Sequence, residues 1–313
     1  LRPAFPVPRL EGKALGDVLA RLRLDCPELF YVTGFSCRVH PAAATVEFLP
    51  QYLFDKGKIR DHQRALAART DRLCRPVLDK GEAEREQYVH DFICQNVRYD
   101  KLKKPYSHEI LGPLGQGVGV CEGIAKSVKA LCDRLGLWCI VALAENNPAK
   151  GIKYRHAWNV VRLGGQYYHL DATFDNSLGG DGLVRYDYFN LDDRRLFRDH
   201  EALVYPVPPC ADGNRFYYKE AGRSFTKVED AARRAAQAIR KKQPLVFHWR
   251  GGPLTREVLG ELAAALEEAA GAKGRHAAIR LNWPQAVLEV RFPEAPPADT
   301  CVAQEANEGE ALE

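Results

Sequence analysis

The sequence lacks a long hydrophobic run. Its longest uninterrupted apolar stretch, residues 137–144, is far shorter than the roughly 20 residues that a membrane-spanning helix requires. The first residues also lack the charged start and apolar core of a signal peptide. We therefore expect no membrane span. Because the chain does not begin with methionine, a secreted protein whose leader has been removed is kept as an alternative.

Neither sign of charge is in large excess. The formal net charge is +4 over 313 residues, of which 27% are charged and 46% are apolar. These proportions are those of an ordinary globular protein, and the length suffices for two or three domains. So small a net charge gives no reason to expect nucleic acid or an anionic membrane as a partner.

The nine cysteines include no Cys-x-x-Cys pair, and their number is odd. Both features argue against a disulfide framework and against a zinc ribbon. Cys94 and Cys132 fall on the apolar faces of predicted helices, where a reduced core thiol is expected. We therefore expect a reducing compartment, which favours the cytoplasm, and we expect neither a metal nor a cofactor.

The first hundred residues predict a mixed but helix-rich segment. Apolar residues recur at helical spacing over residues 12–23, 56–78 and 82–97, and Asp55 is placed to cap the second of these helices. Residues 45–49 alternate between apolar and polar side chains, as a strand does. This segment contains no motif that indicates a reaction, and we expect it to pack around the next part of the chain.

A loop rich in glycine, residues 115–123, leads directly into an amphipathic run. Apolar residues recur at helical spacing over residues 124–135, and Gly136 stands where a C-terminal cap belongs. Cys121 is therefore expected at or near a helix N-terminus, where the helix dipole and unpaired backbone N–H groups favour a thiolate. The alternative is that Cys121 is a small buried hydrophobic residue.

Two β-prone runs on either side of Gly164 and Gly165 predict a hairpin with a two-residue turn. In the register of such a tight turn, Trp158 lies opposite Asp171, and His156 and Asp171 become diagonal neighbours on one face. Diagonal neighbours are about 7–8 Å apart, which allows a hydrogen bond between an imidazole and a carboxylate that lean toward each other. A one-residue bulge would place them on opposite faces.

The residues around these three positions resemble bacterial members of the transglutaminase-like superfamily. The resemblance covers roughly residues 82–205, and the order Cys, His, Asp with its local motifs is more specific than any one motif. The segments that carry it are 99–100, 119–125, 156–159, 168–175, 188–191 and 199–200, with residues 27–32 resembling an N-terminal extension.

The resemblance implies an α+β, papain-like core, with the thiol on a helix that packs against an antiparallel sheet. By this resemblance Cys121 is the nucleophile, His156 is the base and Asp171 orients the base. The sequence lacks the large flanking β-domains and the acidic calcium cluster of animal transglutaminases. A calcium-activated crosslinking enzyme is therefore not expected.

Four further residues are candidates for the site. Gln116 and Tyr99 are candidate side-chain donors to an oxyanion, although a loop glutamine such as Gln116 is more often a solvated residue. Trp158 is expected either to form a wall of the site or to be a core aromatic. His169 lies on the same predicted face as Asp171, and we expect it to pack beside the three catalytic candidates.

The chain is predicted to have four parts. These are a helix-rich extension (1–81), the transglutaminase-like core (82–209), a small α/β sandwich of ferredoxin-like type (210–293) and an acidic tail expected to be disordered (294–313). The sandwich is expected to contain strands at 216–218, 245–249, 277–281 and 286–292 and helices at 227–241 and 255–270. The basic side chains of its first helix are expected to be solvated. The sequence does not indicate what the sandwich binds.

The expected reaction is acyl transfer from a protein or peptide amide through a thioester on the cysteine. The small, unspecialised core favours hydrolysis, which makes the chain a cysteine protease or amidase. Transfer to an amine, as by a protein-glutamine γ-glutamyltransferase, is the first alternative. A catalytically idle binding module ranks lower because the cysteine, histidine and aspartate are all present, and acetyl transfer from a thioester cofactor lacks supporting motifs.

Overall fold

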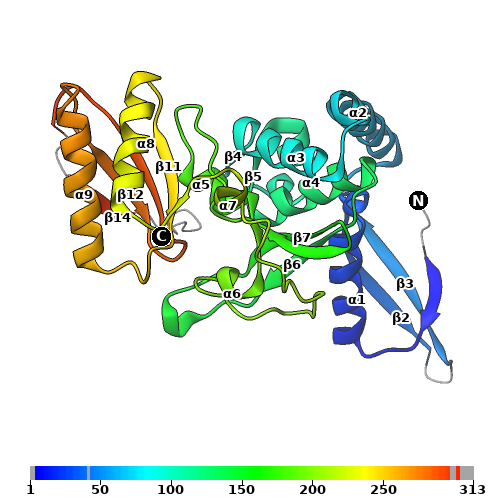
Figure 1. Cartoon of the computed structure of the whole chain (residues 1–313). Helices are drawn as coiled ribbons and strands as arrows, with labels where there is room; N and C mark the ends of the chain where they lie inside the picture. The colour runs from blue at the N-terminus through cyan, green and yellow to red at the C-terminus, as the bar shows by residue number, and fades with distance from the viewer. Residues whose placement is uncertain (1–3, 41–42, 297–300, 304–313) are drawn as a thin grey trace. The chain divides into compact units, whose positions relative to one another are not determined.

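The computed structural model describes residues 4–40, 43–296 and 301–303. The described chain separates into two compact units (Figure 1). The first runs to Tyr167 and includes Leu203–Pro208, and the second comprises Tyr168–Ala202 and the described residues from Pro209 on. In the described part of the chain, no helix is both long enough and apolar enough to cross a membrane.

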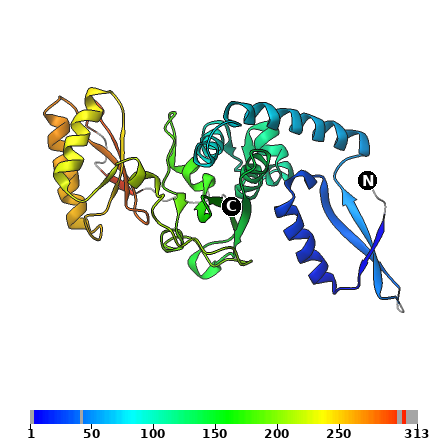
Figure 2. The same ribbon diagram turned by 45° about the vertical axis from the view of Figure 1, so that its right-hand side comes forward.

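The first unit begins with a helix beside a small antiparallel sheet (Figure 2). The predicted helix and strand are both confirmed, and the strand is the middle one of the sheet order β1-β3-β2. The elements are β1 (Phe5–Pro8), α1 (Gly12–Asp25), the 3-10 turn η1 (Pro27–Leu29), β2 (Val32–Val39) and β3 (Thr45–Tyr52).

Three longer helices follow, and α2 and α3 pack against α4. Asp55 caps α2 as predicted, since its carboxylate accepts a hydrogen bond of 2.9 Å from the backbone N–H of Lys58. Gly136 follows the end of α4 with φ of +72°, the left-handed conformation expected of a C-terminal cap. The helices are α2 (Lys56–Cys74, continued by the 3-10 turn η2, Arg75–Val77), α3 (Glu82–Asn96) and α4 (Cys121–Arg134).

The segment between α3 and α4 is compact. Two short parallel strands pair Tyr99 with Gly119, and a 3-10 turn and a π-helical turn lie between these strands in the sequence. The elements are β4 (Arg98–Tyr99), η3 (Pro105–His108), η4 (Leu111–Gln116) and β5 (Val118–Gly119).

A four-stranded antiparallel sheet in the order β6-β7-β8-β9 follows α4. Gly164 and Gly165 both have positive φ, +56° and +82°, as the predicted two-residue hairpin turn requires. The side chain of Asn159 donates a hydrogen bond of 2.9 Å to the backbone oxygen of Ala125, which ties α4 to the sheet. The elements are β6 (Cys139–Ala144), η5 (Pro148–Lys150), β7 (His156–Leu163), β8 (Gln166–Leu170) and β9 (Phe189–Leu191). The α+β fold class is confirmed, and α4 packs against β6 and β7 as a papain-like core requires.

The second unit contains the short helices α5 (Ala172–Leu178), α6 (Asp193–Leu196) and α7 (Tyr217–Glu220), followed by a two-layer α/β sandwich. Both long helices of the sandwich lie on one face of a five-stranded sheet in the order β10-β11-β13-β12-β14 (Figure 1). Its elements are β10 (Ser224–Phe225), α8 (Val228–Arg240), β11 (Leu245–Trp249), α9 (Arg256–Gly271), β12 (Ala278–Asn282), β13 (Val287–Arg291) and β14 (Cys301–Ala303).

The sequence-based prediction for the sandwich is wrong in two respects. The aromatic run at 216–218 is not a strand, because Tyr217 begins α7 and its ring stacks on Tyr186 with centroids 3.8 Å apart. The topology is not ferredoxin-like, because β10 pairs directly with β11 in parallel, whereas the ferredoxin-like arrangement places another strand between its first two parallel strands.

The tail also differs in part from its prediction. Residues 301–303 form β14, which pairs in parallel with β12 and so extends the sheet. A strand joins the edge of a sheet through backbone hydrogen bonds. These bonds do not depend on the acidic side chains from which disorder was predicted. The rest of the predicted tail, apart from residues 294–296, lies outside the described residues.

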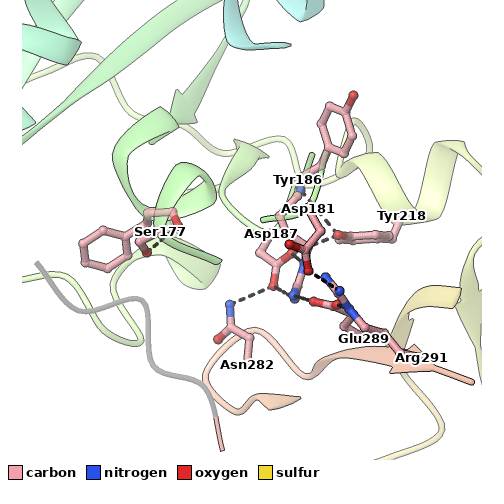
Figure 3. A network of polar contacts seen from close by, with 10 residues as sticks. Ser177, Asp181, Tyr186, Asp187, Tyr218, Asn282, Glu289 and Arg291 are labelled. Carbon is pink, nitrogen blue, oxygen red and sulfur yellow. Dashed lines mark hydrogen bonds and ion pairs between the residues drawn. The ribbon is translucent and has the colours of Figure 1, made fainter. Parts of the chain in front are cut away.

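A buried ionic cluster holds the sandwich to the chain before it within the second unit (Figure 3). Arg185 is fully buried, and its guanidinium donates hydrogen bonds to both carboxylate oxygens of Asp187 at 2.8 and 3.0 Å and to Glu289 at 2.9 Å. Asp187 also accepts hydrogen bonds of 2.9 Å from the Tyr218 hydroxyl and from the Asn282 amide. Each buried charge therefore has an opposite charge or several polar partners, as burial demands.

Replacing Arg185 by methionine should destabilise the protein strongly, because the carboxylates of Asp187 and Glu289 would remain buried without their cation. We expect the free energy of unfolding to fall by about 3–5 kcal/mol in urea denaturation. The matched control is Arg233→Met, whose side chain is 72% exposed and pairs with Asp230, and which should change stability by less than about 1 kcal/mol. Equal effects of the two substitutions would contradict this account of the cluster.

Candidate active site

Cys121 is the first residue of α4, as the sequence predicted. Val120 before it is extended, with φ of −92° and ψ of 173°, and the helix begins immediately after it. The Cys121 side chain is largely buried, since the residue is 8% exposed. A thiol at this position lies at the positive end of the helix dipole.

The backbone of η3 lies directly on the first turn of α4. The Val120 N–H donates a hydrogen bond of 3.0 Å to the backbone oxygen of Ser107. A Cβ built on Gly123 would lie 2.0 Å from that same oxygen, so no side chain fits at this position. The approach of these two backbones sets where the helix, and with it Cys121, begins.

Asp100 in turn holds Ser107. Its buried carboxylate accepts hydrogen bonds from the Ser107 hydroxyl at 2.5 Å, from the Lys104 N–H at 3.0 Å and from the Leu102 N–H at 3.1 Å. Burial by itself raises the pKa of Asp100, but these hydrogen bonds outweigh burial and lower the pKa below its usual value. The ionised carboxylate therefore organises the loop that lies against α4.

A buried lysine neutralises the acidic residues near Cys121. Lys126 is fully buried, and its ammonium lies 2.6 Å from Glu122 and 3.0 Å from Glu109, which also pairs with Arg23. Burial raises the pKa of Glu122, but its hydrogen bond with His108 and the charge of Lys126 outweigh burial and lower the pKa to about 2. Glu122, which follows Cys121, is therefore ionised and paired.

Replacing Gly123 by alanine should destabilise the protein, because the new methyl group would meet the Ser107 oxygen and force the backbones apart. We expect a loss of about 1–3 kcal/mol in the free energy of unfolding. The matched control is Gly16→Ala in α1, where nothing lies within 4 Å of the built Cβ and where alanine should stabilise the helix by up to about 1 kcal/mol. A neutral Gly123→Ala would rule out the proposed close approach.

The two candidate oxyanion donors differ in their surroundings. Tyr99 is half-buried and lies in β4, where it pairs with Gly119. Gly119 is two residues before Cys121 in the sequence. Gln116 is exposed at the end of the π-helical turn η4. Both therefore belong to the segment that precedes α4 in the first unit.

His156 and Trp158 share one face of β7, as the two-residue periodicity of a strand predicts. His156 is the first residue of the strand and pairs with Ala144, while Trp158 pairs with Ala142. Their rings are nearly parallel, with centroids 5.9 Å apart. Both residues are buried, and Trp158 almost completely so.

Asp171 follows β8 in the second unit and caps α5. One carboxylate oxygen, Oδ1, accepts hydrogen bonds from the backbone N–H groups of Thr173 at 2.9 Å and Phe174 at 3.0 Å. The other, Oδ2, lies 3.0 Å from Nε2 of His200. Because the residue is fully buried and both oxygens have partners, its carboxylate is held in one orientation.

Sequence reasoning assigned no role to His200, although residues 199–200 lie in a segment that carried the family resemblance. Its other ring nitrogen, Nδ1, lies 2.9 Å from Asp199, whose second oxygen accepts a hydrogen bond of 2.5 Å from the Tyr188 hydroxyl. Burial lowers the pKa of His200, but its hydrogen bonds to Asp171 and Asp199 and their charges outweigh burial and raise it. The arrangement therefore favours the imidazolium form.

His169 has a different carboxylate partner within the second unit. Its Nε2 lies 2.8 Å from Asp193, and burial, the largest effect, lowers the pKa of His169 despite that contact. Donor atoms of His169, Asp193 and Cys210 lie within 4.8 Å of one another, so these three types of ligand could together hold a metal ion. The contact between His169 and Asp193 gives one ring nitrogen and one carboxylate oxygen a partner. No short-range spacing in the sequence signalled this set.

The comparison with protein-family models agrees with the sequence resemblance. Residues 65–172 match the family model described as the transglutaminase-like superfamily. No curated protein matches the chain. One similar solved structure is described as a TGase, with 14% identity, a TM-score of 0.30, and coverage of 58% of this chain and 52% of the other.

A second similar structure is a candidate cysteine protease from Cytophaga hutchinsonii. It shares 15% identity with this chain at a TM-score of 0.30, and the match covers 48% of this chain and 64% of the other. The chain thus spans about half of the first solved protein and less than two thirds of the second.

Proposed function

We propose that this chain, which belongs through residues 65–172 to the transglutaminase-like superfamily, transfers the acyl group of a protein or peptide amide through a thioester. Cys121 is the nucleophile, His156 the general base and Asp171 the residue that orients the base. The observation that carries the proposal is the position of Cys121 at the start of α4, inside the matched segment that also contains His156 and Asp171. Cysteine-based acyl transfer is the chemistry of this superfamily.

In the first half-reaction, His156 takes the proton of the Cys121 thiol and the thiolate attacks the amide carbonyl. The Cys121 N–H donates to the oxygen as it becomes negative, and Tyr99 and Gln116 are the candidates for a second donor. His156 then gives its proton to the leaving amine, which departs and leaves a thioester. Asp171 keeps the imidazole in the required tautomer and stabilises its charge.

In the second half-reaction, water or an amine attacks the thioester. His156 takes a proton from the attacking molecule, and the Cys121 sulfur leaves and regains a proton. Water yields a carboxylic acid, and an amine yields a new amide. The balance of the reaction is therefore the same for both acceptors, and only the acceptor decides between a hydrolase and a transferase.

The connection between β7 and β8 supports the roles of the histidine and the aspartate. The two strands are neighbours in the sheet and are joined by a two-residue turn. His156 is the first residue of β7, and Asp171 follows the last residue of β8, so each is at the end of its strand away from the turn, which supports these roles.

We propose hydrolysis as the reaction, with transfer to an amine as the second candidate. The small, unspecialised core of this chain is the feature that favours hydrolysis. A catalytically idle binding module is a third candidate, which the presence of all three catalytic residue types disfavours. The substrate is a protein or a peptide in each of the first two cases.

Alkylation of Cys121 by iodoacetamide, followed by peptide mass spectrometry as a function of pH, tests the nucleophile. We expect rapid labelling well below pH 8, because the helix N-terminus and His156 stabilise the thiolate. In His156→Gln, the labelling of Cys121 should move toward the pH range of an ordinary thiol, about 8.5. Cys26 is an internal reference, since burial and the nearby Glu28 raise its pKa. Labelling of wild-type Cys121 only above about pH 8 would refute the assignment.

Incubation of a peptide pool with and without a primary amine separates the three candidate functions. We expect cleavage or deamidation products in both arms, and none with Cys121→Ser as the matched control. If amine adducts dominated, the chain would be a transferase. If wild type changed nothing in either arm while its fold was intact by circular dichroism, the binding module would replace the enzyme.

A further inference from the structure

His200 lies between two carboxylates in the second unit. Its Nε2 is 3.0 Å from Asp171 and its Nδ1 is 2.9 Å from Asp199, and its side chain is 1% exposed. A neutral imidazole has only one N–H, so one of these nitrogens would direct a lone pair at a carboxylate. Only the imidazolium donates to both carboxylates at once.

We propose that His200 is a positioning residue that, as an imidazolium, keeps the Asp171 carboxylate ionised and in a single orientation for its role toward His156. This proposal rests on the function proposed above. It adds to the Cys121, His156 and Asp171 set a second histidine that acts on the aspartate and takes no part in proton transfer with the substrate.

The orientation of Asp171 follows from its partners. Two backbone N–H groups of α5 occupy Oδ1, and His200 lies against Oδ2. The Asp171 N–H also donates a hydrogen bond of 2.9 Å to the backbone oxygen of Tyr188. Removing His200 would withdraw a charged donor from a fully buried carboxylate, and such a carboxylate either takes up a proton or turns.

The groups around His200 favour its charged form. Asp171 and Asp199 are both within hydrogen-bonding distance, and the rings of Phe174 and Tyr188 pack beside the imidazole with centroids 4.7 and 5.6 Å away. The Tyr188 hydroxyl donates to Asp199 and stays protonated, because burial and the Asp199 charge raise its pKa well above the usual value. A positive charge on His169 would disfavour the charged form of His200. The pKa of His169 is lowered, so this opposing effect is weak.

The sandwich contributes to this arrangement through the ionic cluster. Tyr188 donates its backbone N–H to Asp175 at 3.0 Å. It directly follows Asp187, which accepts hydrogen bonds from Arg185 and Asn282. Figure 3 shows the contact between Asp187 and Asn282. The segment that supports Asp199 is thus anchored to the C-terminal sheet. This gives the sandwich a structural part in the site without requiring it to bind substrate.

The pH dependence of the support for Asp171 follows from the direction in which the pKa of His200 is shifted. The pKa of His200 is raised, so the support for Asp171 is present below that pKa and is lost as pH rises through the pKa of His200 in the folded protein. Asp199→Asn removes one of the two charges and should lower that pKa. Loss of activity on the alkaline side should then begin at lower pH.

His200→Gln keeps an N–H donor but removes the charge and the titration. For product formation from a peptide that the wild type turns over, we expect kcat to fall about 10- to 100-fold with KM little changed. The alkaline loss that arises from His200 should be absent. The matched control is His248→Gln, a buried histidine of β11 paired with Ser224, which should leave kcat and the pH profile unchanged.

Imidazole NMR of the full chain with isotope-labelled histidine gives a readout independent of turnover. We expect His200 to carry both ring protons above the ordinary histidine pKa of about 6.5, and Asp171→Asn to lower its pKa. His200 titrating at or below the ordinary value overturns the proposal, as does an unchanged kcat in His200→Gln.

If His200→Gln does not fold, Asp199→Asn replaces it as the test, because that variant retains the histidine. An alkaline loss of activity that does not move to lower pH in Asp199→Asn would then contradict the proposal. If wild-type protein shows neither turnover nor selective labelling of Cys121, the proposed function fails and this role falls with it, whatever the NMR result.

Discussion

The position of the candidate nucleophile depends on one contact, in which the backbone of Ser107 lies on the first turn of α4. The contact exists only because residue 123 has no Cβ, which would lie 2.0 Å from the Ser107 oxygen. Asp100 stabilises the approaching loop by gathering its N–H and hydroxyl donors, and Lys126 balances Glu109 and Glu122 beside it. The start of the helix is thereby set by packing and charge together.

The second unit meets a different constraint, which is the cost of burying charge. Asp171, Asp187 and Glu289 have little or no exposure, and each lies beside a histidine or arginine that offsets its desolvation. Such clusters add little to the net free energy of unfolding, yet removal of one partner lowers it strongly because the other charge stays buried. They specify geometry, and here the geometry they specify includes the orientation of the candidate catalytic aspartate.

Much of the local structure was predictable. Asp55 at a helix start, Gly136 after a helix end and Gly164–Gly165 between two strands are short-range signals with direct conformational causes, and all three were confirmed. The aromatic run at 216–218 was misread because three residues show no periodicity, and its helical conformation depends on contacts of Tyr217 and Tyr218 with Tyr186 and Asp187. The ferredoxin-like assignment was wrong because the order of elements, β10-α8-β11-α9-β12-β13-β14, differs from the β-α-β-β-α-β order of that fold.

The sequence by itself determined most of the longer helices and strands, the placement of Cys121 at a helix N-terminus and the resemblance to a superfamily, because these depend on side-chain spacing over a few residues. Tertiary structure alone decided that His200 meets Asp171 across 29 positions, that His169 meets Asp193 across 24, and that Arg185 meets Glu289 across 104. Partners so far apart come together through strand pairing and the burial of whole faces. No local pattern encodes which polar groups will meet there.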